Sequence, residues 1–411
     1  MSGDHLRSAS AGPGPLRVAV VGAGIGGLTL AIALRRYGIA VDVYEQAPEL
    51  REVGAAVALA ANASRLLERF GLEPALREVS VEPTELVYRG WRDDRRLVSH
   101  PVGLGDAYRD RFGASFHGIH RAELQRILMA AVEPQTLHLG RAVTGVAESP
   151  DGVRLEFVDG TSAEADLVVG ADGVHSAVRR RVAGAAPAVY SGTSGFRGLV
   201  PVDAVPSLPD PMAIQFWMGP GAHLLHYAIG RGDTINFLAV VEGPATWTSP
   251  TGTADAAPGE LAAHFAGWHP AVLEMIDAVP QSERWALFTL PPLTHWSRGR
   301  AVLLGDAAHA MLPHHGQGAN QTVEDAVTLA ACLAGAAPGG HADAFRRYER
   351  LRRTRTRLVQ RSSFETSALL HLPDGPAAQA RDRDLTQLVE RFGWIHAYDA
   401  AGAAGADRSA S

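Results

Sequence analysis

A glycine-rich turn between a short strand and a helix is the sequence feature that most constrains the fold. The β-branched run Arg17–Val21 leads directly into Gly22–Gly27, and Leu28–Tyr37 then has the spacing of a helix. Ile39–Glu45 has the pattern of a second strand. A strand, a helix and a strand in such quick succession predict two parallel, buried strands of an α/β sheet.

The same turn has the residues that a dinucleotide needs. Gly22 makes the tight turn, Gly24 lets the backbone approach a pyrophosphate, and Gly27 lets the helix pack closely on the strand. The helix N-terminus offers free N–H groups to the phosphates. Glu45 ends the second strand, where its carboxylate would bind ribose hydroxyls and repel a 2′-phosphate. We expect the adenosine of FAD or NAD here, although a non-catalytic dinucleotide-binding module would also satisfy this turn.

Two further segments place an acid at the end of a buried strand. Asp172 stands between glycines after Ala165–Gly170, where it either serves the cofactor or caps the next helix. Asp306 follows Ala301–Leu304 and is suited to hold hydroxyls of a sugar or ribityl chain. The glycine-rich segment Gly316–Gly318 then exposes the N–H groups of the next helix, which would stabilise the negative charge of a reduced flavin.

A metal site at the third segment is a weaker alternative. Asp306, His309, His314 and His315 are possible ligands. However, the histidines straddle a proline-containing loop, and no paired acid supports them. We therefore expect no metal.

Composition removes several classes of protein. All 38 basic residues are arginine, which excludes P-loop NTPases and pyridoxal-phosphate enzymes because both need a lysine. The single cysteine, Cys332, lies in an apolar helical run and is expected to be a buried core residue of a protein from a reducing compartment. No run of about 18 apolar residues predicts a membrane span. Met1–Pro15 lacks the apolar middle of a signal peptide, so we expect a cytoplasmic protein.

Charge gives no sign of a nucleic-acid or membrane partner over the whole chain. The net charge of −6 is spread along the sequence. The arginine-rich, amphipathic stretch Phe345–Arg361 is more typical of a packed surface helix than of a membrane-binding or nucleic-acid-binding one.

Taken together, the three segments resemble the class A, single-component FAD-dependent aromatic hydroxylases, over roughly Arg17 to Arg361. The similarity is strongest to the branch that contains salicylate hydroxylase, 3-hydroxybenzoate 6-hydroxylase and 6-hydroxynicotinate 3-monooxygenase. Supporting stretches include Arg197–Pro201 and Gly267–Pro270. The resemblance implies FAD, NAD(P)H as co-substrate and O2, with a flavin C4a-hydroperoxide that hydroxylates a small aromatic compound. No second nicotinamide-binding Rossmann unit is present in the sequence, which fits transient use of NAD(P)H.

The resemblance also implies an architecture: a Rossmann-like α/β FAD-binding domain of the glutathione reductase type, an inserted antiparallel-sheet substrate domain and a C-terminal helical segment. The change to strand patterns near Tyr190 agrees with this. We expect a disordered 1–15, an FAD-binding domain made of 16–75, 101–185 and 280–335, and a mostly β substrate domain made of 76–100 and 186–279. Helices would follow in 336–400, with a disordered tail over 401–411, in a monomer or homodimer.

Many of the implied site residues fall on the cofactor. The resemblance places Arg121 near the flavin, with Gln125 one helical turn further along. The full set of cofactor-binding residues that we expect is Gly22, Gly24, Ile25, Gly26, Gly27, Glu45, Gln46, Arg121, Gln125, Asp172, Gly305, Asp306, Pro313, Gly316, Gly318, Ala319 and Asn320.

The expected substrate site lies on the inserted sheet. His223, Leu225 and Tyr227 share one face of a strand, whereas His226 faces the other way. The resemblance makes His223, Tyr227 and His314 the catalytic candidates. A neutral histidine can accept the proton of a phenol, which activates the ring, but a His–Tyr pair that only packs the sheet remains an alternative.

The substrate candidates are Val57, Trp217 and Leu225. Relatives often read Gly-Ala-Gly-Ile where this chain reads Gly54-Ala55-Ala56-Val57, followed by Ala58–Ala60. The pocket is therefore expected to be more apolar, which argues against a small charged benzoate and leaves open a larger aromatic or polyketide-like substrate, or an alkene that is epoxidised. A non-oxygenating FAD-dependent dehydrogenase or reductase is a separate alternative, because it would share the binding segments but would need no water-excluding pocket.

Overall fold

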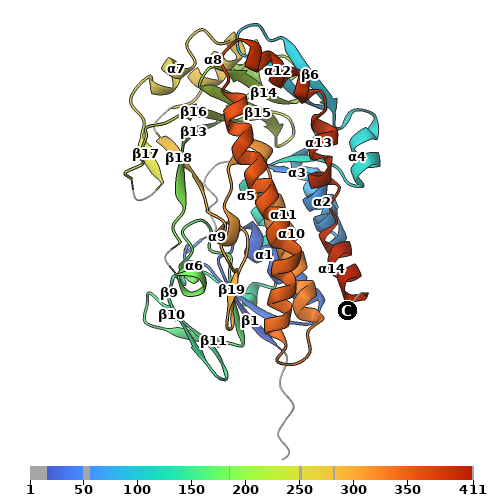
Figure 1. The fold of residues 1–411 in the computed structure, drawn as a ribbon, viewed down its shortest axis with the longest axis vertical. Coiled ribbons are helices and arrows are strands. Elements are labelled where there is room, and N and C mark those ends of the chain that lie inside the picture. The colour runs from blue at the N-terminus through green and yellow to red at the C-terminus, as the bar shows by residue number, and fades with distance from the viewer. Residues whose placement is uncertain (1–15, 50–55, 185, 250–251, 281–282, 410–411) are drawn as a thin grey trace, which may run out of the picture.

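The chain forms two stacked sheet regions joined by long helices (Figure 1). The computed structural model describes residues 16–49, 56–184, 186–249, 252–280 and 283–409. The N-terminal segment 1–15 and the pair Gly54 and Ala55 lie outside the described residues.

The first region is a parallel sheet in the order β19-β20-β12-β1-β2-β8, in which only β19 runs antiparallel. Its strands are β1 (Arg17–Val21), β2 (Ala40–Tyr44), β8 (Leu137–His138), β12 (Leu167–Gly170), β19 (Ser297–Arg298) and β20 (Ala301–Leu303). The expected strand–helix–strand unit is confirmed, with α1 (Ile25–Arg36) between β1 and β2. The carboxyl ends of β1, β12 and β20 therefore meet at one edge, and the three predicted segments follow them directly.

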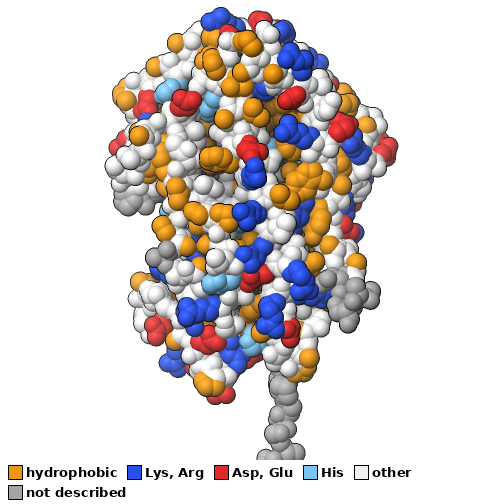
Figure 2. Space-filling view, viewed as in Figure 1, with side chains coloured by type: hydrophobic (Ala, Val, Ile, Leu, Met, Phe, Trp, Pro, Cys, Tyr) orange, Lys and Arg blue, Asp and Glu red, His pale blue; other side chains and the backbone are white. Residues whose placement is uncertain are grey.

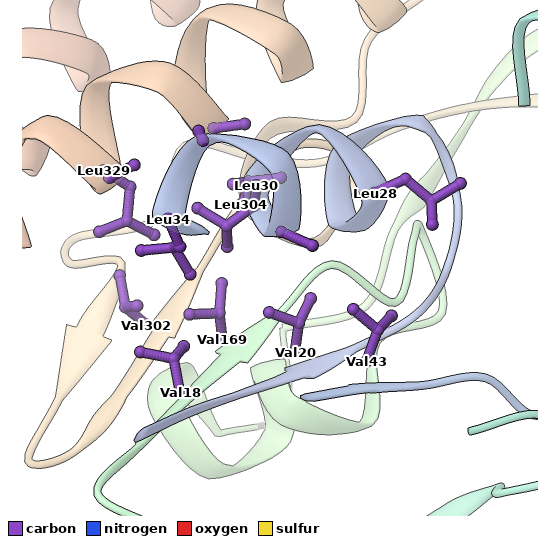
Figure 3. Close-up of a cluster of buried hydrophobic side chains, with 14 of the residues drawn as sticks. Val18, Val20, Leu28, Leu30, Leu34, Val43, Val169, Val302, Leu304 and Leu329 are labelled. Atoms are coloured by element: carbon purple, nitrogen blue, oxygen red, sulfur yellow. The ribbon is translucent and has the colours of Figure 1, made fainter. Parts of the chain in front are cut away.

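The parallel sheet is stable because its strands and helix α1 bury apolar side chains against each other. Val18, Val20 and Val169 point from the strands toward Leu30 and Leu34 of α1 (Figure 3). On its other side α1 packs against α10 (Gly318–Ala334). The buried position of Cys332 on α10 agrees with the expected core role.

The second region is a large sheet in the order β17-β18-β13-β16-β15-β14-β5-β6. Its strands are β5 (Glu85–Gly90), β6 (Arg96–Pro101), β13 (Val189–Pro201), β14 (Ile214–Gly219), β15 (Ala222–Ile229), β16 (Thr234–Glu242), β17 (Thr253–Asp255) and β18 (Glu283–Thr289). The pairs are antiparallel except β14 with β5, which run parallel. One face of this sheet packs on α7 (Glu260–His264) and α8 (Pro270–Asp277), and the other turns toward the first region.

Two smaller sheets complete the strand structure. They consist of β3 (Ala56–Leu59), β7 (His117–His120) and β4 (Ser80–Val81), and of β9 (Val143–Ser149), β10 (Gly152–Phe157) and β11 (Ser162–Ala165). The remaining helices are α2 (Ala61–Arg69), α3 (Glu73–Val79), α4 (Ala107–Phe112), α5 (Arg121–Ala130), α6 (Ala177–Ala183), α9 (Asp306–His309), α11 (His341–Leu370), α12 (Pro376–Leu385), α13 (Leu388–His396) and α14 (Ala400–Ser409). Short 3-10 turns are η1 (Leu104–Asp106), η2 (Pro134–Thr136), η3 (Val202–Ala204) and η4 (Pro313–His315).

The structure differs from the expected organisation at three places. The alternating pattern of Leu137–Leu139 is typical of a meander with the two strands that follow it, but β8 pairs with β2 in the parallel sheet. β18 belongs to the large sheet beside β13, although 280–335 was assigned to the FAD-binding domain, because its alternating side chains complete that sheet's edge. The tail expected to be disordered from 401 is helical up to Ser409, where α14 packs on α10.

The arginine-rich stretch is part of the 30-residue helix α11, which runs along the length of the molecule (Figure 1). Basic side chains predominate along the middle of this face, with some acidic side chains among them (Figure 2). Two of its arginines, Arg352 and Arg355, point inward and are buried. The packed-helix interpretation is the one that the structure supports.

Candidate active site: a cofactor cleft and an adjoining aromatic cavity

The glycine-rich turn lines a cleft at the edge of the parallel sheet. Gly22 has a φ of +102°, and a Cβ there would lie 2.5 Å from the carbonyl oxygen of Ala171. A Cβ on Gly27 would lie 1.9 Å from the carbonyl oxygen of Gly22, so α1 is pressed against its own loop. At Gly24, in contrast, no described atom lies within 4 Å of the Cβ position, and this residue faces the cleft. The turn thus combines two glycines for packing with one for a ligand.

Glu45 and Gln125 hold this turn from behind. The Glu45 carboxylate accepts hydrogen bonds from the backbone N–H of Ala23, at 2.8 Å, and of Ala47, at 2.9 Å. Gln125 donates from Nε2 to the carbonyl oxygen of Ala23 at 3.1 Å. These two residues and the exposed Gln46 are not among the residues that line the cleft. Contact of Glu45, Gln46 and Gln125 with a cofactor therefore stays a prediction.

The second predicted segment contributes backbone and not its acid. Asp172 accepts hydrogen bonds from the N–H groups of Ala177, at 2.6 Å, and Val178, at 3.1 Å, and from the Ser176 hydroxyl. Its carboxylate therefore caps α6, which was the alternative interpretation, and the expected direct role in cofactor binding is wrong for this geometry. Ala171 and Gly173 line the cleft in its place.

The third predicted segment faces the cleft through Gly305 and Asp306. Gly305 has a φ of +62°, and a Cβ there would lie 2.8 Å from Thr322 Oγ1, so only glycine fits. The Asp306 side chain is exposed to the cleft, and among the described residues its carboxylate has no hydrogen-bond partner. It is available to a ligand hydroxyl.

The N-terminus of α10 forms the opposite wall. Pro313, Gly316, Gly318 and Ala319 line the cleft, and the first turn of α10 has no side-chain cap. Asn320 does not line it, which corrects the expectation for this residue. Its amide bonds the N–H of Ala60, at 2.8 Å, and the carbonyl oxygens of Ala58 and Gly316, so it ties β3 to α10.

A buried charged cluster beneath this segment was not predicted. Asp325 accepts hydrogen bonds from the Gly305 N–H, at 3.0 Å, and from Arg352 Nε, at 2.7 Å, and its carboxylate lies 2.5 Å from His309 Nε2. Burial raises the pKa of Asp325, but His309 and Arg352 beside it bring the pKa below its usual value. Glu324 likewise pairs with Arg352 and Arg355. This cluster holds the Gly305–His309 turn in place, and its arginines come from the stretch that composition alone left unexplained.

Two arginines give the cleft a positive field. Arg121, which was predicted, and Arg197, which was not assigned a role, both line it. Burial and the nearby Arg121 lower the pKa of Arg197, while Tyr227 acts in the opposite direction. The Arg197 guanidinium also lies 4.9 Å from the ring centroid of Trp285. Arg197 is the one charged residue of β13, and this was the signal that the sequence offered.

A second cavity of about 350 Å³ adjoins the cleft. Ala58, Leu225, Tyr227 and Gly316 line both spaces, so the cleft and the cavity share part of their wall. The aromatic rings around the second cavity are those of Tyr88, Tyr108, Phe112, Phe116, Phe216, Tyr227 and Phe392. We call it the aromatic cavity.

Alternation along β14 places Phe216 and the substrate candidate Trp217 on opposite faces of the sheet. Phe216 lines the aromatic cavity, whereas Trp217 points to the other face, stacks on His269 at 4.9 Å and is fully buried. The expected contact of Trp217 with substrate is therefore wrong, since adjacent residues of a strand face opposite ways. Leu225 lines both cavities, and Val57 lines the cofactor cleft alone.

The three catalytic candidates differ in whether they reach the aromatic cavity. Tyr227 and His314 line the aromatic cavity, but His223 does not. His223 lies behind His314, with ring centroids 5.1 Å apart, and its Nδ1 is 2.8 Å from Nε2 of His371. The expectation that His223 faces the substrate directly is thus not met. His226 faces away from the cavity, as expected.

Burial keeps these histidines neutral. It lowers the pKa of His314 to about 3 and that of His371 to about 4, and it holds the pKa of His223 well below its ordinary value. Neither ring nitrogen of His314 has a hydrogen-bond partner among the described residues. A buried, unpaired imidazole at a cavity wall is a candidate to receive a hydrogen bond from a ligand.

The described residues support neither a metal site nor a membrane-spanning helix. Within the described ranges, no group of three or more histidine, cysteine, aspartate or glutamate residues is arranged to hold a metal ion. Likewise, none of the described helices is long and apolar enough to span a bilayer.

The residues of the cleft fit a bound flavin dinucleotide. Gly24 and Gly318 leave open space where a Cβ would stand, and the N-termini of α1 and α10 aim uncapped N–H groups at the cleft. Beside it lies a cavity shaped for an aromatic ring. This arrangement defines an oxidoreductase that holds FAD next to an aromatic compound.

Comparison with known proteins agrees. Residues 16–363 match the family described as FAD binding domain. The chain is 43% identical over 387 residues to a 3-amino-4-hydroxybenzoate 2-monooxygenase of Streptomyces platensis, covering 94% of this chain and 96% of that one. It is 36% identical to 6-hydroxynicotinate 3-monooxygenase of Bordetella bronchiseptica, over 87% of this chain and 92% of the relative.

Solved structures give the same result. Klebsiella pneumoniae HpxO in complex with FAD and uric acid superimposes with a TM-score of 0.81 at 30% identity, covering 92% of this chain and 94% of that one. The chain therefore belongs to the FAD-binding family of class A aromatic hydroxylases. It is an FAD-dependent aromatic monooxygenase, and the relatives support this function and not the epoxidase or dehydrogenase alternatives.

Proposed function

We propose that this enzyme uses NAD(P)H and O2 to hydroxylate a small phenolic aromatic acid at the junction of the two cavities. The observation that carries the proposal is the shared lining by Ala58, Leu225, Tyr227 and Gly316. These residues would bring a ring in the aromatic cavity into contact with the flavin. The names of the relatives, which act on 3-amino-4-hydroxybenzoate and 6-hydroxynicotinate, support a hydroxylated aromatic carboxylate as the substrate class.

FAD, when bound, supplies the hydride acceptor and the site of oxygen activation. Asp306 would hold its ribityl hydroxyls, and Gly24 and the α1 N-terminus would hold its phosphates. The α10 N-terminus, with Arg121 and Arg197, would stabilise the negative charge of the reduced ring system. Asp172 and Asn320 act one layer further out, by fixing the loops that carry these groups.

The substrate side is served by side chains. Leu225, Phe216 and Tyr227 position the ring, and the apolar side chains around them would limit the access of water to the reacting carbon. His314, neutral and without a partner, accepts the hydrogen bond of the phenolic hydroxyl and so increases electron density on the ring. His223 and His371 support His314 from behind.

Turnover with labelled dioxygen tests the proposal. Yellow, FAD-loaded enzyme should oxidise NADH or NADPH slowly alone and faster with 3-amino-4-hydroxybenzoate, salicylate or 6-hydroxynicotinate. The product should carry one atom of labelled oxygen. Acceleration without label in any product would overturn oxygen insertion. The cytoplasmic location and the monomeric or dimeric state stay predictions.

A further inference from the structure

One wall of the aromatic cavity carries polar groups that the reaction does not use. It is formed by Tyr108, Arg111 and Phe112 of α4 and by Glu390, Phe392 and His396 of α13, and we call it the outer wall. All six residues line the aromatic cavity, and none is among those that line the cofactor cleft. The outer wall therefore contacts the part of a substrate that does not touch the flavin.

The two helices of this wall are in van der Waals contact. A Cβ on Gly393 of α13 would lie 3.5 Å from the Phe112 ring and 3.7 Å from Arg111 Nη2. The rings of Phe112 and His396 meet edge to face, with centroids 5.6 Å apart. The position of His396 is thus set by close contact across the wall.

Hydrogen bonds set the orientation of the His396 ring as well. The backbone N–H of Ala61 donates to the Tyr108 oxygen at 3.0 Å, which leaves the hydroxyl proton of Tyr108 for His396 Nδ1, 2.9 Å away. With Nδ1 acting as acceptor, the proton of a neutral imidazole sits on Nε2. Burial lowers the pKa of His396 to about 4, with His315 and Arg355 acting in the same direction. The hydrogen bond with Tyr108 occupies Nδ1, so Nε2 is the ring nitrogen that is left for a ligand.

Arg111 brings positive charge to the same wall. Its described ion pair is with Glu390, at 3.4 Å, and both side chains are largely exposed, at 46% and 66%. An exposed pair of this kind is weak, so the guanidinium can turn to a stronger acceptor. A carboxylate on the ligand would meet one N–H donor and one cation, and charge-assisted hydrogen bonds are the strongest of their kind.

We propose that His396, oriented by Tyr108 and assisted by Arg111, is a subsite for the carboxylate of the aromatic substrate. The inference rests on the proposed function, because it names where the acid group of that substrate class binds. It makes His396 a specificity-determining residue that distinguishes an aromatic acid from the corresponding neutral phenol.

Binding to the FAD-loaded enzyme, measured without turnover, tests this subsite. The two probes are 3-amino-4-hydroxybenzoate and 2-aminophenol, which lacks the carboxylate, and each is titrated by its effect on the visible spectrum of bound FAD. Wild type should prefer the acid. His396→Phe should weaken binding of the acid by about ten- to a hundredfold, as expected for one hydrogen bond to a charged group, and change the binding of 2-aminophenol little.

Three further variants sharpen the result. His396→Gln keeps an N–H donor and should retain most of the preference for the acid. Arg111→Gln, on an exposed side chain that the fold tolerates, should reduce it independently of His396. His100→Phe changes another histidine of the cavity, which lies 3.1 Å from the Leu385 carbonyl oxygen, and should affect acid and phenol alike.

A folded, FAD-loaded His396→Phe enzyme that binds the acid as tightly as wild type would overturn the subsite. Equal binding of both probes by wild type would do the same. Failure of the proposed function looks different: the acid would still bind in preference to the phenol, but no hydroxylated product would form.

Discussion

The cofactor cleft and the aromatic cavity share part of their lining, yet they are built from different material. The cleft is made largely of backbone, with Gly24, Gly305 and Gly318 at the ends of strands and helices. The aromatic cavity is made of large side chains from β5, β14, β15, α4 and α13, which lie far apart in the sequence. The first site is specified by short local segments, whereas the second exists only after the chain has folded.

The two sites are also braced differently. Beneath the cleft, Arg352 joins Glu324 and Asp325 in a charged cluster with no exposed side chain. Around the aromatic cavity the support is ring packing, as in the stack of Tyr88 on Phe216 at 4.9 Å. Removing one member of the charged cluster should therefore destabilise the protein far more than removing one ring beside the aromatic cavity.

Arg352→Ala is expected to have the largest effect. It leaves two buried carboxylates without their common partner, so the free energy of unfolding should fall by about 3–5 kcal/mol. FAD should also be retained poorly, because Asp325 holds the N–H of Gly305. Urea unfolding of the apoprotein and FAD content after gel filtration measure the two effects.

The matched control is Arg361→Ala on the same helix. Arg361 is exposed and pairs with Glu365 one turn away, so its loss should hardly change the free energy of unfolding. Similar stability of the two variants would show that the buried cluster does not brace the cleft.

Gly27→Ala and Gly24→Ala separate packing from ligand contact within the glycine-rich turn. A methyl group at Gly27 meets the Gly22 oxygen at 1.9 Å, so the apoprotein should lose about 1–3 kcal/mol of stability together with its FAD. A methyl group at Gly24 meets no described atom within 4 Å, so the apoprotein should melt normally while FAD binds more weakly.

Thermal melts of both apoproteins, with FAD titrations, give the comparison. If Gly24→Ala destabilised the apoprotein as much as Gly27→Ala, the division of this turn into packing and ligand-binding positions would be wrong.

How far the sequence could predict each site follows from this difference. The cleft was predictable because a positive φ or a close backbone approach demands glycine at a particular place, as at Gly22 and Gly305. The strand–helix–strand pattern around Gly22 then predicted the sheet that places these turns together. The errors at Asp172 and Asn320 are errors of side-chain direction, because sequence does not show whether an acid or amide at a turn faces the ligand or the adjoining backbone.

The aromatic cavity was less predictable. His396 and Tyr108 meet although 288 residues separate them in the sequence, and neither stands in a recognisable segment. Strand alternation correctly grouped His223, Leu225 and Tyr227 on one face, but it could not show that His314 lies between His223 and the cavity. Whether a residue on that face reaches the cavity depends on which other elements pack against the face. The residues near it in the sequence do not show this.

The variant with the smallest expected effect tests which face of β14 lines the aromatic cavity. Phe216→Leu removes an aromatic surface of the cavity, so KM for the aromatic substrate should rise by about two- to tenfold, which corresponds to about 0.5–1.5 kcal/mol for one ring contact.

Trp217→Phe, one residue along β14, removes a ring that stacks on His269 behind the sheet. It should lower the melting temperature and leave KM unchanged, because the side chain lies in the other core. Steady-state kinetics with both folded variants decides the matter. A KM that rose only in Trp217→Phe would restore the original assignment and place the substrate on the opposite face of the sheet.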